Sequence, residues 1–236
     1  MTRNLLTIDI GTSSLKAAVL TESGRLLSYI RRPLLRSGES LEDWQPDRWI
    51  RALKDSIATV VGDYRLAGLS VSGNGPTVVG VDERDQPVPP TLLWLDGRSQ
   101  AVTGDSSFYL PKVEWLRRNA PDSFARIRRF LAFPEYLLLY LTGTAVSITP
   151  SDAFSEFIWN RESIDRYGMA PELFPPYVDI GATVGTVRPS VARETGLPEG
   201  LPVFAGGSDF LMSLLGTATV RPGRTCDRAG TSEGIN

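Results

Sequence analysis

The sequence predicts an α/β domain with a mixed β-sheet flanked by helices. Three apolar segments near the start of the chain, residues 4–10, 15–21 and 26–32, are separated by short turns, which predicts an antiparallel meander. A fourth segment, residues 66–73, holds almost only apolar or small residues, as is typical of a central parallel strand. Strands then alternate with segments of helical spacing, and this alternation indicates a mixed sheet covered by helices.

Turn and helix signals separate the first elements. The small residues Gly11, Thr12 and Ser13 follow the first strand, and Gly24 follows the second. Pro46 predicts the start of a helix, because proline is favoured in the first helical turn. Apolar residues then recur at helical spacing and define one buried face. They are Trp49, Leu53, Ile57, Val60 and Val61.

The middle of the chain predicts a hairpin and then helices. Residues 77–82 and 87–96 flank a polar turn, as the two arms of a hairpin would. Residues 111–142 have a helical pattern in three pieces, broken at Pro121 and near Pro134 and closed by Gly143.

The last third predicts fewer regular elements. Residues 187–196 predict a short helix, residues 201–207 a strand, and residues 209–218 a helix after it. Many of the 17 prolines lie between residues 171 and 202, which predicts ordered surface loops there.

The composition excludes several classes of function. The length of 236 residues suits one large domain or two small ones. Lys and Arg number 25 and Asp and Glu 27, so the net charge of −2 gives no general attraction to nucleic acid or to an anionic membrane. Histidine is absent, which excludes Ser-His-Asp and Cys-His catalysis and histidine metal sites. Proton transfer must use carboxylates, lysine, tyrosine or water.

The cysteine count and the apolar segments bear on the compartment. Cys226 is the only cysteine, so no intrachain disulfide forms, which fits a reducing cytoplasm. The longest apolar stretch is too short and too interrupted to span a bilayer. We expect a soluble, cytoplasmic protein, and a homodimer is compatible with the sequence.

The turn after the first strand is a candidate phosphate site. Small residues let successive main-chain N–H groups form an anion nest, and the hydroxyls of Thr12 and Ser13 add donors. Asp9, at the end of the preceding strand, could hold Mg²⁺ directly or through water. An ordinary hairpin with a solvated Asp9 explains this segment equally well.

Asp209 is the second candidate. It follows an apolar strand and precedes a helix, and ligands of open α/β sheets sit in the crevice at the carboxyl ends of strands. A carboxylate there can accept a hydroxyl proton as the oxygen attacks phosphorus. Taken alone, Asp209 is more simply explained as the N-cap of the helix.

The third candidate is the segment of residues 94–98, Trp-Leu-Asp-Gly-Arg. An aromatic ring such as that of Trp94 can cover the C–H faces of a sugar while charged groups bind its hydroxyls. A buried tryptophan beside a surface pair of Asp96 and Arg98 explains the segment equally well.

Other phosphate and nucleophile motifs carry no assignment. The sequence has no G-x-x-x-x-G-K-[ST], and Gly73 and Gly75 lack the third glycine of a dinucleotide fingerprint. Residues 230–234 fit G-x-S-x-G, but a nucleophile elbow needs a histidine base, which this chain lacks.

Six collinear segments nevertheless match one set of motifs. Residues 8–27 resemble a first phosphate segment, residues 43–49 "EQDPEEWW", residues 93–99 "LWNDGRT", residues 136–143 "DYLxxxLTG", residues 205–216 "AGGGDxxxxxxG", and residues 229–232 a second phosphate loop. Together they resemble the FGGY family of carbohydrate kinases, whose members include xylulokinase, gluconokinase and glycerol kinase.

The resemblance implies a duplicated ribonuclease H-like fold, shared with actin and hexokinase. Two such domains would close over ATP, Mg²⁺ and a sugar, sugar acid or polyol. Asp209 would be the general base on the sugar hydroxyl, and Asp9 would lie near Mg²⁺. The cofactor-binding residues would be Asp9, Gly11, Thr12, Ser13, Gly230, Thr231 and Ser232. The substrate would lie near Asn74, Trp94, Asp96, Arg98 and Phe210.

Two positions depart from the family pattern. Xylulokinases carry Gln-Met-His-Gly and glycerol kinases Asn-Gln-Arg-Glu where this chain has Gly-Asn-Gly-Pro at residues 73–76. Phe210 stands where many members have a polar Asn or Gln. Both departures concern the substrate and not the reaction class.

The resemblance also divides the chain. We expect residues 1–220 to form the N-terminal ribonuclease H-like domain and residues 221–236 to be the first strand and phosphate loop of an absent C-terminal domain. On that expectation the chain alone has little or no kinase activity. One alternative is a catalytically silent actin-like module that binds sugar or nucleotide. A second is a hexokinase-type enzyme, against which the segment around Trp94 and the late position of Asp209 argue.

Overall fold

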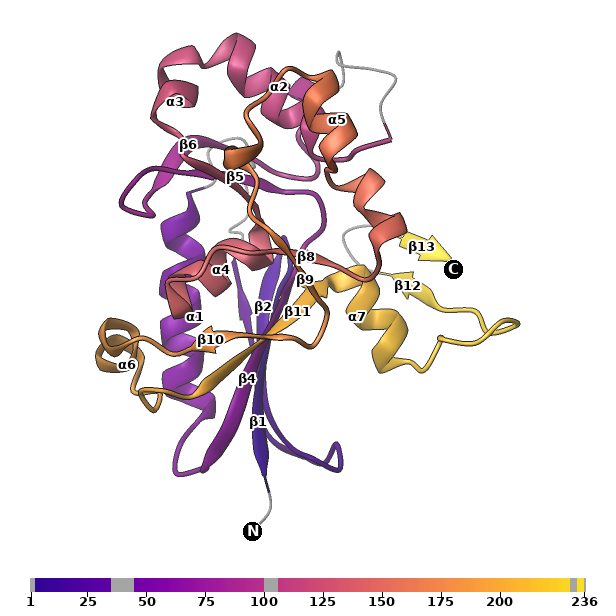
Figure 1. Ribbon diagram of the computed structural model, residues 1–236. Helices are drawn as coiled ribbons and strands as arrows, with labels where there is room; N and C mark the ends of the chain where they lie inside the picture. The colour runs from indigo at the N-terminus through magenta and orange to yellow at the C-terminus, as the bar shows by residue number, and fades with distance from the viewer. Residues whose placement is uncertain (1–2, 35–44, 100–105, 230–232, 236) are drawn as a thin grey trace.

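A six-stranded sheet forms the centre of the molecule in the computed structural model, which describes residues 3–34, 45–99, 106–229 and 233–235 (Figure 1). The strands lie in the order β10-β11-β4-β1-β2-β3. They are β1 (Asn4–Ile10), β2 (Ser14–Thr21), β3 (Leu26–Pro33), β4 (Leu66–Gly73), β10 (Thr183–Thr186) and β11 (Pro202–Ser208).

The sheet is mixed, as predicted. β1, β2 and β3 form the antiparallel meander. β1 also pairs in parallel with β4, and β4 pairs in parallel with β11. β10 closes one edge antiparallel to β11. The carboxyl ends of the three parallel strands β1, β4 and β11 therefore lie side by side. They form the edge of the sheet at which these strands end, which is not the edge that β10 closes.

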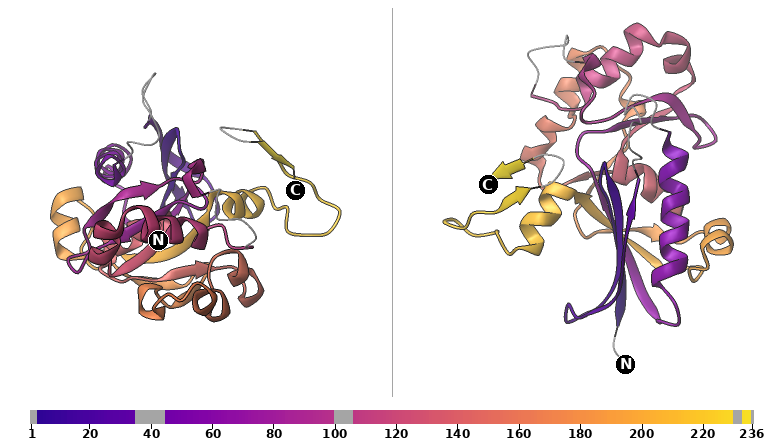
Figure 2. Two further views of the ribbon diagram at one scale, coloured as in Figure 1. Left: turned by 90° about the horizontal axis from the view of Figure 1, so that it is seen from above. Right: turned by 180° about the vertical axis from the view of Figure 1, so that it is seen from behind.

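Helices cover both faces of this sheet. Trp49, Leu53 and Ile57 of the first helix are fully buried and share one core with Leu6 and Ile8 of β1, which confirms the predicted helical face. Figure 2 shows α1 and α7 on opposite sides of the sheet. The helices on the sheet are α1 (Pro46–Val60), α4 (Phe133–Thr142), α6 (Pro189–Thr195) and α7 (Asp209–Gly216).

A second, smaller core lies beyond the carboxyl ends of the central strands. A three-stranded sheet in the order β6-β5-β7 carries it, and Figure 1 shows this sheet above the main one. Phe130, Trp159 and Leu110 are fully buried there. The elements of this region are β5 (Val78–Val81), β6 (Pro87–Leu92), β7 (Arg129–Ala132), α2 (Leu110–Asn119), α3 (Pro121–Arg126) and α5 (Arg161–Arg166).

Two expectations about the second half were wrong. Residues 129–132 form a strand within the segment predicted as helix, because Phe130 and Leu131 pair with β5 and enter the two cores. A strand of four residues is too short to show a period of its own. The stretch from 171 to 202 contains more than loops and the helix predicted at 187–196, which α6 confirms. It also holds β10 and β9 (Tyr177–Asp179), and β9 pairs with β8 (Ser147–Thr149).

The remaining elements are short. β12 (Asp227–Ala229) and β13 (Glu233–Ile235) pair with each other in an antiparallel hairpin, apart from the main sheet. Among the described residues, no helix combines the length and the apolar character needed to cross a membrane. The 3₁₀ helices are η1 (Gly97–Ser99), η2 (Asp152–Phe157) and η3 (Pro171–Leu173).

Candidate active site

The candidate site lies where β1, β4 and β11 end together. Ile10 of β1 and Ser208 of β11 both pair with Gly73 of β4. One residue earlier, Asp9 and Gly207 both pair with Ser72. Open α/β sheets bind ligands at such an edge.

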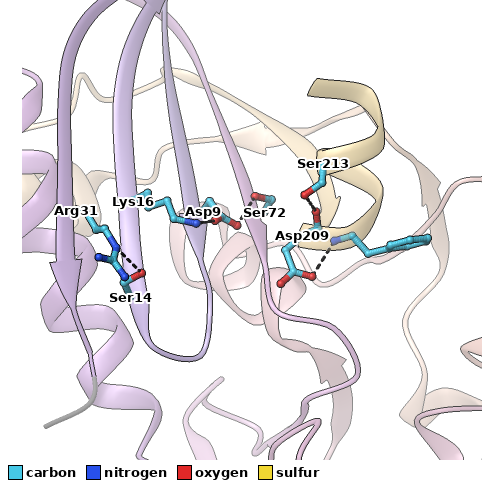
Figure 3. Close-up of polar contacts among 8 residues, drawn as sticks. Asp9, Ser14, Lys16, Arg31, Ser72, Asp209 and Ser213 are labelled. Atoms are coloured by element: carbon cyan, nitrogen blue, oxygen red, sulfur yellow. Dashed lines mark hydrogen bonds and ion pairs between the residues drawn. The ribbon is translucent and has the colours of Figure 1, made fainter. Parts of the chain in front are cut away.

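Asp9 is held on β1 by two side chains. Its carboxylate accepts a hydrogen bond from Ser72 Oγ at 3.0 Å and forms an ion pair with Lys16 Nζ at 3.1 Å (Figure 3). Ile8 and Ile10 point into the core, so the strand alternation places Asp9 on the opposite face, which carries α7. Asp9 lines an open hollow of about 370 Å³ there, together with Ser72 and Met212 of α7.

Asp209 begins α7 directly after β11. Ser208, and not Asp209, is the N-cap, since Ser208 Oγ accepts from the main-chain N–H of Leu211 at 3.4 Å. The Asp209 carboxylate accepts from the main-chain N–H of Phe210 at 2.7 Å, and its carbonyl oxygen accepts from Ser213 Oγ at 2.7 Å. The simple capping explanation of Asp209 therefore does not hold.

Asp9 and Asp209 flank the end of the same central strand. Figure 3 shows them on either side of Ser72. β1 and β11 are separated by β4 alone, so two strand spacings, about 10 Å, separate the strand ends that carry them. The two carboxylates thus belong to one edge of one sheet.

The turn Gly11–Ser13 joins β1 to β2 at this edge. The Gly11 N–H donates to the Ser14 carbonyl at 3.0 Å and so closes the turn. Within the described residues, no hydrogen bond from the N–H groups of Thr12 and Ser13 is present. Thr12 is only 8% exposed, and its Oγ1 accepts from the indole Nε1 of Trp94 at 2.7 Å.

A chain of hydrogen bonds connects this turn to the end of β4. The main-chain N–H of Asn74 donates to the carbonyl of Ile10 at 2.9 Å. Asn74 Oδ1 accepts from Thr77 Oγ1 at 2.7 Å, and Thr77 Oγ1 accepts from the main-chain N–H of Trp94 at 3.2 Å. Trp94 then reaches Thr12. Sequence reasoning missed Thr77, which carries no motif of its own.

An apolar cavity of about 150 Å³ lies beside the first turn of α7. We call it the aromatic cavity, since five aromatic residues line it. Its lining is Asn74, Gly75, Pro76, Phe108, Tyr109, Ala132, Pro134, Glu135, Ile148, Pro150, Phe154, Phe157, Ile158, Gly207, Ser208, Phe210 and Leu211. The chain neighbours of Asp209, Ser208 and Phe210, line this cavity. Met212, three residues further along α7, lines the hollow beside Asp9.

Asn74 and Phe210 are the two predicted substrate residues that line this cavity. The side chain of Asn74 is 2% exposed, and its Nδ2 is buried without a hydrogen-bond partner among the described residues. Buried donors in folded proteins are normally satisfied, so an unpaired amide against a cavity indicates space for an acceptor.

Two buried ionisable groups line the same cavity and were not predicted. Burial raises the pKa of Glu135 to about 7, although its two oxygens accept from the main-chain N–H groups of Ala132 and Ile148 at 2.7 Å each. Burial also raises the pKa of Tyr109, with smaller contributions from the charges of Glu135 and Asp209.

Asp96 and Arg98 pair with each other. Arg98 Nε donates to Asp96 Oδ1 at 2.9 Å, and a second guanidinium nitrogen reaches the other oxygen. Burial alone would raise the pKa of Asp96, but the hydrogen bonds from Arg98 outweigh it and lower that pKa. The Arg98 guanidinium lies 4.9 Å from the ring centre of Trp115. Neither residue lines the aromatic cavity or the hollow beside Asp9.

The predicted residues therefore separate into three groups. Asp9, Gly11, Thr12, Ser13, Asn74, Asp209 and Phe210 come together at the ends of β1, β4 and β11, and Trp94 reaches them through Thr12. Asp96 and Arg98 lie in their own pair. Gly230, Thr231 and Ser232 lie outside the described residues.

The chemistry of this edge can be compared with what Mg²⁺ bound to a nucleotide requires. Mg²⁺ in phosphate-transfer sites usually takes one or two carboxylates, water and substrate phosphates, not an all-protein cage. No group of three or more acidic, histidine or cysteine side chains with metal-binding geometry occurs in the part of the chain that the structure describes. The single carboxylate of Asp9, hydrogen-bonded by Ser72, fits the first pattern.

Comparison with known proteins identifies the relatives of this arrangement. The model of the N-terminal domain of the FGGY family of carbohydrate kinases matches residues 4–106 and 101–216. A xylulose kinase of Lactococcus lactis is 28% identical, over 92% of this chain and 49% of its own length. A gluconokinase of Bacillus subtilis is 24% identical, over 100% of this chain and 52% of its own length. The chain spans about half the length of the curated relatives it matches.

Solved structures confirm the predicted fold class. A gluconate kinase from Lactobacillus acidophilus superposes with a TM-score of 0.88 at 16% identity, covering 100% of this chain and 54% of its own. A glycerol kinase of Plasmodium falciparum, solved with ADP, has a TM-score of 0.85 at 14% identity, covering 99% of this chain and 54% of its own. At these identities the superpositions establish the fold alone, the ribonuclease H-like fold that the sequence predicted.

Proposed function

The chain belongs to the FGGY family of carbohydrate kinases, and on this basis we propose that it contributes the base and the phosphate turn for phosphoryl transfer from ATP to a sugar, sugar acid or polyol. One observation carries the proposal. Asp9 lies on β1 and Asp209 directly follows β11, two strand positions away, so that they flank Ser72 at the edge where such sheets bind ligands.

Asp209 is the general base in this proposal. Its carboxylate takes the proton of the acceptor hydroxyl while that oxygen bonds to the γ-phosphorus and the bond to the β-phosphate oxygen of ATP breaks. The products are ADP and the phosphate ester. General bases contribute roughly 10² to 10⁴ in rate. The first turn of α7 holds Asp209 for this step through the N–H of Phe210.

The turn Gly11–Ser13 receives the transferring phosphate. The N–H groups of Thr12 and Ser13 and the Ser13 hydroxyl supply donors, since the Gly11 N–H already closes the turn. Asp9 would hold Mg²⁺, which neutralises charge on the phosphates when bound. Lys16, paired with Asp9 at 3.1 Å, keeps that carboxylate on the phosphate side of β1.

A second domain is the partner that the proposal requires. The relatives are about twice as long as this chain. We propose that a C-terminal domain of the kind those relatives carry closes over the edge and binds the adenosine. Closure would exclude water and so limit hydrolysis of ATP.

ADP release tests the proposal. The longest polypeptide that the gene encodes is assayed with ATP, Mg²⁺ and a panel of ketoses, sugar acids and polyols. We expect turnover of at least one acceptor, and Asp209→Asn should lower its kcat by roughly 10² to 10⁴ while sugar binding stays within threefold. Asp165→Asn, which removes only an exposed pair with Arg161, is the control and should change nothing.

The alternative class has a distinct outcome in the same assay. A catalytically silent module would bind sugar or nucleotide without turnover of any acceptor. Equal ADP release by the native protein and Asp209→Asn would reject Asp209 as the base.

A further inference from the structure

We propose that the acceptor carries a deoxygenated, apolar end, as a deoxyketose or deoxypolyol does, and that this end lies in the aromatic cavity. The inference rests on the proposed function and concerns its substrate class. It follows from what lines the cavity and from what the lining lacks.

Aromatic rings make up much of the wall. Phe108, Tyr109, Phe154, Phe157 and Phe210 line the cavity from three separate segments. Phe108 and Phe157 stack with ring centres 6.0 Å apart, and Phe154 lies 5.3 Å from Phe157. Phe108, Phe154 and Phe157 therefore form one aromatic cluster in the wall.

The polar side chains of the wall are mostly engaged. Both oxygens of Glu135 accept main-chain N–H groups. Asn74 Oδ1 accepts from Thr77, which leaves only Nδ2 for a ligand. The hydroxyls of Tyr109 and Ser208 are the other side-chain groups of the wall that can hydrogen-bond a ligand. Among the described side chains of the wall, Asn74 Nδ2 and these two hydroxyls can serve a ligand, which is fewer polar groups than an alcohol hydroxylated at every carbon presents.

The cavity adjoins the proposed base. Phe210 follows Asp209 in the chain and lines the cavity, and Ser208 before it does so too. An alcohol bound in this cavity therefore lies beside the first turn of α7, which carries Asp209. Asn74, at the end of β4, faces the same space and can donate to one oxygen of the acceptor.

The physical preference follows from the cost of an unpaired hydroxyl. A ligand hydroxyl that leaves water for a ring face loses its hydrogen bonds, whereas a methyl group at the same place gains from burial. Apolar pockets discriminate by roughly 100-fold against an isostere that only adds a hydroxyl.

Stacking of a fully hydroxylated sugar is the competing explanation of aromatic rings. Such sites combine a ring with charged side chains that bind the hydroxyls around its rim. Here the charged pair that the sequence offered for that role, Asp96 and Arg98, is self-paired and lies off the cavity. The wall therefore favours an apolar ligand end.

Binding of matched pairs tests the inference. Calorimetry on this chain compares 1-deoxy-D-xylulose with D-xylulose, and 6-deoxy-L-fructose with L-fructose. We expect the deoxy member to bind roughly 10- to 100-fold more tightly in at least one pair. Equal or tighter binding of the parent in both pairs, or no binding of any of the four, overturns the inference.

Substitutions in the cavity wall test whether the preference for the deoxy sugar arises there. Phe210→Asn places a polar group on the cavity wall and should reduce the deoxy preference at least fivefold, while Asn74→Ala should weaken both members of a pair alike. Leu26→Asn, at an exposed position of β3, is the control. Thermal unfolding checks that each variant is folded. A preference that survives Phe210→Asn unchanged places the selectivity outside this cavity and rejects the inference.

Failure of the inference differs from failure of the proposed function. If the full-length polypeptide phosphorylates parent and deoxy sugars equally and Asp209→Asn abolishes turnover, the function stands and the inference falls. If deoxy sugars bind tightly and no acceptor is ever phosphorylated, the inference stands and the function falls.

Discussion

The indole Nε1 of Trp94 donates a 2.7 Å hydrogen bond to Oγ1 of Thr12, and so joins segments 82 residues apart. The bond fixes a hydroxyl of the proposed phosphate turn from the loop that follows β6. Sequence reasoning left Trp94 with two equal explanations, stacking on a sugar and simple burial. The structure gives it a second and more direct task, which is to position the turn.

Trp94→Phe should loosen the phosphate turn without breaking the fold. The substitution leaves the nearly buried Thr12 hydroxyl without its partner, which costs about 1–2 kcal/mol in the free energy of unfolding. Thr12→Val should cost a similar amount. In the double variant, denaturant unfolding should show a coupling of about 1 kcal/mol between the two sites. Strict additivity would mean that the bond contributes nothing.

Glu135 should make stability depend on pH. Its pKa is raised to about 7 in the folded protein against an ordinary value of 4.5, so the folded state holds one more proton than the unfolded state between these values. Stability from this group is therefore full below pH 4.5, falls as the pH rises through the window, and levels off above 7.

Glu135→Gln removes that titration. The difference in unfolding free energy between the native protein and Glu135→Gln should change by about 3 kcal/mol from pH 4.5 to 7.5, with the native protein losing stability as the pH rises. Glu156→Gln, at an exposed position, serves as the control and should show a flat difference. A flat difference for Glu135→Gln would contradict the burial argument.

Gly206 should tolerate no side chain. It lies at the bulge where β11 shifts register against β4, and a Cβ there would overlap the carbonyl oxygen of Val71. Gly206→Ala should lower the unfolding free energy by about 3 kcal/mol or prevent folding, since main chain must move to admit it. Gly216→Ala, which meets nothing within 4 Å, should be neutral within about 0.5 kcal/mol. Equal stability of both variants would show that the bulge yields freely.

Asp9→Asn should affect Mg²⁺ use more than stability. The Lys16 pair is part-exposed, and such pairs are worth less than about 1 kcal/mol, so the melting temperature should barely move. The Mg²⁺ concentration that gives half the maximal phosphorylation rate should rise at least tenfold. Asp209→Asn should lower the rate and leave that Mg²⁺ concentration unchanged. An equal Mg²⁺ requirement for native protein and Asp9→Asn would remove Asp9 from the metal site.

The meander and the central strand could be predicted because each carries its own local signal. Residues 4–10 and 66–73 are apolar runs of strand length, and Gly11 and Gly24 mark the turns after the first two strands. The first helix has a complete amphipathic face from Trp49 to Val60. Such patterns survive into the fold because tertiary packing reinforces them.

Other parts of the structure have no local signal. β7 and β10 each contain four residues and become strands only because β5 and β11 offer them partners. The aromatic cavity gathers Phe108, Phe157 and Phe210 from positions up to 102 residues apart in the chain, and nothing in their local sequence sets them apart from core aromatics. The self-pairing of Asp96 with Arg98 was one of two explanations that the sequence supported equally.

The convergence of Asp9 and Asp209 on one reaction centre is tested most directly by a metal-to-sugar distance. In the longest encoded polypeptide, Mn²⁺ replaces Mg²⁺ with a non-hydrolysable ATP analogue, and relaxation of a ¹³C-labelled sugar reports its distance from the metal. The account predicts a metal-to-sugar distance on the order of 10 Å, set by two strand spacings. It also predicts that Asp9→Asn abolishes the relaxation of the sugar by Mn²⁺. A bound sugar that Mn²⁺ does not relax, or relaxes equally in Asp9→Asn, would contradict it.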